Sequence, residues 1–139
     1  MADLTALIRL HKFELDEKRI TLGELYSALA LLEREKAALE SALALEKKAV
    51  DAGGDIHFTF LLYVERVRQQ RQGLDHREDL LNKQIEKAKD SLMETFGELK
   101  KYEMTQEERE RLAGEERRLK ESRELDAIGL ETFRRKGEE

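Results

Sequence analysis

Residues 51–55 read Asp51-Ala52-Gly53-Gly54-Asp55, which is the only place in the sequence where two helix-breaking residues adjoin. Glycine supplies the positive φ that the C-terminus of a helix favours. An aspartate that follows can cap the next helix by accepting from its free amides. We therefore interpret residues 52–55 as a hairpin turn, with Gly53 and Gly54 at its centre.

Upstream of the turn, residues 4–50 repeat apolar side chains at alternating steps of three and four, interrupted only by His11, Lys18, Lys36 and Glu46. Seven residues per two helical turns, kept over this length, are typical of a coiled-coil seam rather than of a globular helix. Such a helix spans on the order of 70 Å and is too long to be stable alone. It needs a partner helix along its seam.

Downstream of the turn, residues 60–102 carry a second seam with the same spacing. If the two helices fold back about the paired glycines, apolar residues of the two seams face each other. Because this alignment centres on the glycines, an antiparallel hairpin within one chain is favoured over a parallel dimer. The predicted pairs include Leu43 with Val64, Leu32 with Leu74, Leu25 with Leu81 and Leu15 with Leu92. We expect helix 1 at about 3–51, with Asp3 as its N-cap, and helix 2 at about 56–104.

The same alignment places Lys36 opposite Arg71, which gives a like-charged layer within the seam. Polar seam positions cost stability but fix register and orientation. We expect the repulsion between these two cations to be reduced in one of two ways. Either their side chains extend (snorkel) towards Glu33, Glu35 or solvent, or an acidic group on a partner lies beside them.

The chain continues beyond the hairpin, which ends at about Tyr102. Thr105-Gln106-Glu107-Glu108 is a capping-box pattern, so helix 2 either restarts there as a helix at about 106–135 or runs through without a break. No residue of helix 1 is left to cover this segment. The predicted fold class is all-α: a long two-helix antiparallel coiled-coil hairpin with a C-terminal helical extension, forming a single domain over residues 1–139.

The composition of the chain argues against several classes of function. Of 139 residues, 41% are charged, the net charge is -5, and both signs are interspersed, so no basic stripe for nucleic acid is present. No stretch approaches the roughly 20 apolar residues that a membrane span requires. Cysteine is absent and no two histidines stand three or four apart, so we expect no metal site. Without a phosphate-binding loop or a place for a deep pocket, we expect no cofactor and no enzymatic activity.

Two apolar groups are expected to contact proteins. The first lies beside the turn, with Phe58, Phe60, Leu62 and Tyr63; the alternative is a small core that closes the hairpin. The second lies near the C-terminus, with an alternative as a frayed tail. Its residues are Leu125, Ile128, Phe133, Arg134 and Arg135.

The beginning LTALIRLHKFELDEKR, the leucine-rich first helix, the turn, the charged second helix and the ending RLKESRELDAIGLETFRRK together resemble the FliJ family of flagellar type III export proteins. The resemblance covers the layout of the whole chain. It implies a non-enzymatic stalk, similar to the coiled-coil subunit of rotary ATPases, whose end with both termini enters the hexameric export ATPase.

The resemblance further implies that the stalk activates this ATPase and couples it to the export gate membrane protein and to export chaperones. Such a protein is cytoplasmic, peripherally associated with the inner membrane, and monomeric when free. The alternative is a self-associating coiled-coil scaffold protein without an ATPase partner.

Overall fold

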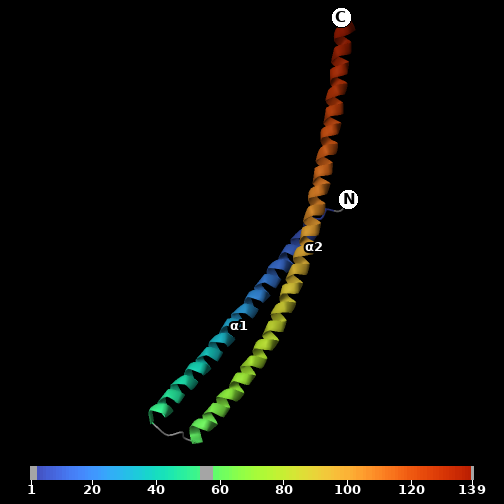
Figure 1. The fold of residues 1–139 in the computed structure, drawn as a ribbon. Helices are drawn as coiled ribbons and strands as arrows, with labels where there is room; N and C mark the ends of the chain where they lie inside the picture. Colours follow the sequence, from blue (N-terminus) through green and yellow to red (C-terminus); the bar gives the residue numbers. More distant parts are fainter. Residues whose placement is uncertain (1–2, 54–57, 139) are drawn as a thin grey trace. The chain divides into compact units, whose positions relative to one another are not determined.

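The computed structural model describes residues 3–53 and 58–138, and two long helices contain nearly all of them. α1 spans Thr5–Gly53 and α2 spans Phe58–Glu138. The predicted all-α two-helix hairpin is confirmed (Figure 1). α2 passes through Thr105 without interruption, so of the two alternatives for the C-terminal segment the structure has the continuous helix.

Contacts divide the chain into two compact units, and each is described by itself. The hairpin unit is Phe13–Thr95 and contains most of α1 and the first part of α2. The end unit joins residues 3–12 to residues 96–138.

In the hairpin unit, α1 and α2 run antiparallel and pack along one line of side chains. Leu15, Leu32, Val67 and Ile85 are its buried apolar residues, each at most 5% exposed. All four occupy positions of the two predicted seams. A two-helix coiled coil encloses only this narrow stripe, so the remaining faces of both helices are exposed to solvent.

The predicted register of the hairpin is wrong by about one helical turn. Lys36 does not face Arg71: its Nζ lies 2.7 Å from Asp75 Oδ1 and donates to Glu78 Oε2 at 2.9 Å. Arg71 instead pairs with Glu40, with 3.0 Å between Nη2 and Oε1. Each residue of α1 therefore meets residues of α2 further from the turn than the sequence alignment placed them.

Electrostatics explains why the shifted register is the better one. The predicted alignment brings two cations together within the seam, whereas the observed one gives each cation an acidic partner. The hydrogen bonds from Lys36 to Asp75 and Glu78 raise the pKa of the lysine and the bond to Lys36 lowers that of Asp75. Apolar layers are similar in both registers, so the charged layers decide between them.

A second lysine in the seam is also satisfied within the hairpin unit. Lys18 donates to the carbonyl oxygen of Ser91 at 3.3 Å and to the hydroxyl of Thr95, which is buried. Of the three polar interruptions of the α1 seam in this unit, Lys18 and Lys36 thus have specific partners on α2, which is how such residues fix a register. The third, Glu46, is exposed.

At the turn, α1 includes Gly53 as its last residue, later than the predicted helix end. The backbone of Gly53 does not have a positive φ, so the left-handed conformation predicted for it is wrong. Gly54 and Asp55 lie outside the described residues, as do the predicted start of the second helix at 56 and His57. α2 begins at Phe58.

In the end unit, the predicted role of Asp3 at the start of α1 is confirmed. Its Oδ1 accepts from the backbone N–H of Thr5 at 3.0 Å and from Gln106 of α2 at 3.0 Å. The hydrogen bonds from Thr5 lower the pKa of Asp3. Further along, the ring of His11 stacks on Tyr102, with 5.1 Å between ring centroids. These contacts hold the first turns of α1 against α2.

Candidate functional site

The apolar group beside the turn divides between two faces of α2. Phe58 is 73% exposed and Leu61 and Leu62 are also exposed, whereas Phe60 and Tyr63 are half-buried. Side chains three and four residues apart share a helix face, so Phe58, Leu61 and Leu62 form one exposed apolar surface, which we call the tip surface. Tyr63 is also covered by Arg66, whose guanidinium lies 6.0 Å from the ring centroid.

The four residues that were predicted beside the turn therefore divide into an exposed pair and a half-buried pair. Of the residues predicted to contact a partner, Phe58 and Leu62 are available on the surface, while Phe60 lies on the predicted seam and is half-buried. Leu61 was not among the predicted contact residues. Helical periodicity relative to Phe58 is the signal that identifies it.

The C-terminal segment of α2, residues 107–138, is the second candidate surface, and we call it the extension. Its large apolar residues are all exposed: Leu112, Leu119, Leu125, Ile128, Leu130 and Phe133. The predicted cluster spreads over more than one face, because Ile128 is separated from both Leu130 and Phe133 by well over a quarter turn. Leu130 and Phe133 lie on the same side as Leu112 and Leu119.

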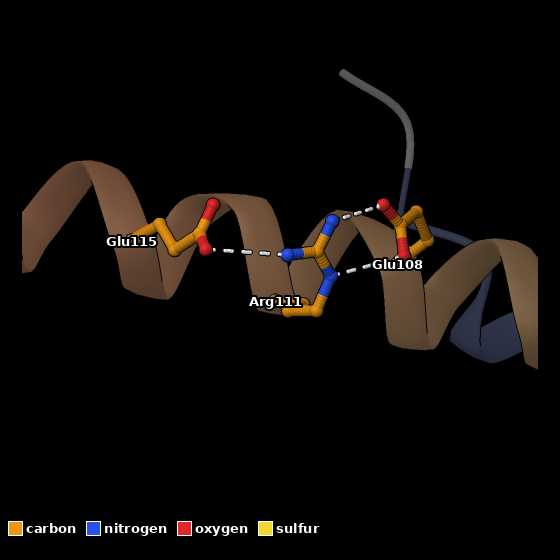
Figure 2. Close-up of polar contacts among 3 residues, drawn as sticks. All are labelled: Glu108, Arg111 and Glu115. Carbon is orange, nitrogen blue, oxygen red and sulfur yellow. Dashed lines mark hydrogen bonds and ion pairs between the residues drawn. The ribbon is translucent and has the colours of Figure 1, made fainter.

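The extension is held helical by ion pairs within the helix. Arg111 donates from Nε and Nη2 to the two carboxylate oxygens of Glu108, at 3.1 and 2.6 Å, and from Nη1 to Glu115 at 3.3 Å (Figure 2). This fork lowers the pKa of Glu108 and raises that of Arg111. Pairs three and four residues apart support an isolated helix by roughly 0.2–0.5 kcal/mol each.

The basic residues at the end of the extension are partnered in the same way. Arg134 Nη2 lies 3.0 Å from Glu131 Oε2, and Arg135 Nε lies 3.5 Å from Glu131 Oε1. Their positive charge is thus shared with one carboxylate, and both side chains stay exposed. What the extension offers a partner is mainly its apolar residues, rimmed by charge.

A third exposed surface was missed in the sequence. On α1, Phe13, Ile20, Leu31 and Leu45 are exposed and lie on one helix face, with polar or small residues between them. The denser leucine repeat of the seam toward α2 masks this sparser row. We call these four residues the outer row.

The described residues offer three exposed apolar surfaces: the tip surface, the extension and the outer row. Within residues 3–53 and 58–138, no group of three His, Cys, Asp or Glu side chains is placed to hold a metal ion. None of the helices described is long and apolar enough to cross a bilayer. The hollows along the helices are open grooves, such as the one between Ala38 and Gly73.

The chain was compared with protein-family models, with curated proteins and with solved structures, and none of them matches it. A function for this chain is therefore inferred from its residues and their geometry.

Proposed function

We propose that this protein is a non-enzymatic stalk of the bacterial flagellar export apparatus, which binds and activates the export ATPase ring. In this proposal the stalk also couples the ring to the export gate and to export chaperones, and it lies at the cytoplasmic side of the inner membrane. The likeness of the chain's layout to the FliJ family suggests this role, and three features of the structure support it.

The observation that carries the proposal is the exposed extension. α1 begins at Thr5, and Asp3 already contacts Gln106, so no described residue of α1 remains to cover the helix beyond. Even so, α2 continues as one helix to Glu138. A helix that keeps its shape through its own ion pairs and presents Leu112, Leu119, Leu130 and Phe133 on one side suits insertion into a protein ring.

The hairpin unit and the tip surface support the second half of the role. Specific polar layers at Lys18 and Lys36 fix the two helices in one register, which makes the hairpin a defined rod rather than a sliding pair. The tip surface, with Phe58, Leu61 and Leu62, gives this rod a separate apolar contact site. One chain thereby offers two partners two different surfaces.

The test measures ATP hydrolysis by the purified export ATPase with and without the full chain, together with a pull-down. We expect capture of the ATPase and faster hydrolysis. Replacing Leu130 and Phe133 by serine should weaken binding at least about tenfold, as loss of two apolar anchors does. The matched control is Met93→Ser, which removes an apolar side chain of α2 that is also well exposed but lies outside the extension.

Failure of the unaltered chain to bind or stimulate the ATPase would overturn the proposal and favour the scaffold alternative. If the Met93 control weakens binding as much as the double variant, the extension is not the contact site. Circular dichroism of each variant checks that helicity is unchanged.

A further inference from the structure

The outer row lies on the side of α1 that faces away from α2. Its four residues, all in the hairpin unit, are 63%, 58%, 56% and 70% exposed for Phe13, Ile20, Leu31 and Leu45. They belong to a row of positions that follow one another at alternating steps of three and four, the spacing of a coiled-coil seam. The full row is 13, 17, 20, 24, 27, 31, 34, 38, 41 and 45. Large apolar side chains at this spacing on an exposed face are suited to packing against a further helix.

The positions between the apolar residues of the outer row carry a pattern of charge. Glu17 and Glu24 fall in its first half, and Arg34 falls in its second half. Neither Glu24 nor Arg34 has an ion pair within the part of the chain that the structure describes. A helix that carries the same row in the opposite direction would bring opposite charges together.

We infer that a second copy of this chain covers the outer row, with the two α1 helices packed antiparallel about a two-fold axis near residue 29. In this arrangement every position of the row meets its counterpart in the other copy, as the self-complementary interface of a symmetric dimer requires. The pairs are Phe13 with Leu45, Glu17 with Ser41, Ile20 with Ala38, Glu24 with Arg34 and Ser27 with Leu31.

The charges select this orientation. An antiparallel pair places Glu24 of each copy opposite Arg34 of the other, so the attractive layer occurs twice. A parallel pair in register would instead place Glu24 against Glu24 and Arg34 against Arg34, and like charges at facing positions oppose association. In the antiparallel pair, Phe13 of each copy also meets Leu45 of the other copy, so an apolar pair closes the interface at each of its two ends.

The residues that flank the row allow the two helices to approach closely. Near its centre stand Gly23, Ala28, Ala30 and Ala37, which have small side chains, and Glu35, whose carboxylate pairs with Arg77 of α2. The distance between packed helices depends on the side chains at the contact, and small ones permit the shorter end of the range. Most flanking positions at the centre of the predicted interface therefore carry small side chains.

The first experiment measures the mass of the full chain by sedimentation equilibrium over a range of concentrations. We expect a monomer–dimer equilibrium. Glu24→Arg and Arg34→Glu, made singly, each turn both attractive layers into repulsive ones. Each should weaken dimerisation at least about tenfold, because two exposed charge pairs change sign together.

The double variant Glu24→Arg/Arg34→Glu is the decisive sample, because it exchanges the charges and should restore dimerisation to the level of the unaltered chain. A parallel dimer would gain nothing from the exchange. The helicity of the three variants at low temperature, measured by circular dichroism, should equal that of the parent, since both side chains are exposed in the single chain.

Cross-linking tests the geometry independently. The chain contains no cysteine, so Glu17→Cys and Ser41→Cys each introduce a single thiol at an exposed position. Mixed under oxidising conditions, the two variants should form a disulfide-linked dimer between unlike chains. Each variant alone should not, because in the antiparallel pair identical positions lie several helical turns apart.

A chain that stays monomeric at all concentrations overturns this inference, as does a dimer that the single charge exchanges leave unchanged. Cross-links within each variant alone would show a parallel pair and would also overturn it. The inference does not rest on the proposed stalk function, and it departs from the monomer that the resemblance to the FliJ family implies for the free chain. ATPase stimulation without dimerisation would reject the inference and leave the proposed function, and dimerisation without stimulation would do the reverse.

Discussion

Ile85, where α1 lies beside α2, is 4% exposed, whereas Leu119, in the extension of the same helix, is 57% exposed. The two stretches of α2 differ in what stabilises them. In the hairpin unit, burial against α1 contributes most of the free energy, at roughly 25 cal/mol per Å² of apolar surface. In the extension, helix propensity and intrahelical ion pairs must suffice. A single helix is thus supported in two physical ways.

The charged residues show the same contrast. In the hairpin unit several ion pairs connect the two helices, as between Lys36 and Asp75 or Arg71 and Glu40, beside pairs within one helix such as Arg68 with Glu65. Those of the extension stay within α2, as around Arg111. Interhelical pairs discriminate between registers, whereas intrahelical pairs support only the helix. Loss of a charge should therefore change hairpin specificity in one stretch and local helicity in the other.

The largest effect is expected from shortening a buried residue of the paired stretch. Ile85→Ala should lower the free energy of unfolding by about 2–3 kcal/mol, because it removes buried apolar surface and leaves a gap in a narrow core. Leu119→Ala is the matched change in the extension and should stay within about 0.5 kcal/mol. Urea unfolding followed by circular dichroism measures both. Equal losses would contradict the contrast between the two stretches.

A smaller effect is expected from the charged layer of the hairpin. Because the bond to Lys36 lowers the pKa of Asp75 below its usual 3.8, this carboxylate stabilises the fold above that pH and the contribution is lost as the pH falls through the lowered value. Asp75→Asn should therefore destabilise the protein at neutral pH, with a difference that vanishes in acid.

Thermal unfolding at neutral and acidic pH checks this prediction. The control is Asp79→Asn, at an exposed position on the same helix with no ion pair within the described residues. We expect the melting temperature of Asp79→Asn to equal that of the parent at both pH values. A pH-independent deficit in Asp75→Asn would mean that Lys36 does not depend on Asp75 as a partner.

The smallest effect is expected from two glycines. Alanine at Gly73 or Gly114 favours a helix by about 0.5–1 kcal/mol, and an added Cβ would meet nothing within 4 Å at either site. Gly73→Ala should raise the urea midpoint of the hairpin. Gly114→Ala should slow hydrogen exchange in the extension and leave that midpoint unchanged. A shifted midpoint for Gly114→Ala would show that the extension unfolds together with the hairpin.

Much of the fold follows from local pattern. The steps of three and four set which residues are buried, so Leu15, Leu32, Val67 and Ile85 lie where the seams predicted them. The exposure of Phe133 also follows from the lack of a facing residue on α1. The outer row on α1 is not apparent in the sequence, since a stronger repeat on the same helix masks its periodicity.

The residue pattern is enough to predict that two amphipathic helices pack antiparallel, because a long apolar stripe must be covered and the helix breakers lie between the two stripes. The register of the two helices is established by their packing in three dimensions. Moving one helix by a turn replaces each leucine layer with another, so burial hardly distinguishes the alternatives. The polar layers do: Lys36 has acidic neighbours in the observed register and Arg71 in the predicted one, and the charges settle what the apolar pattern leaves open.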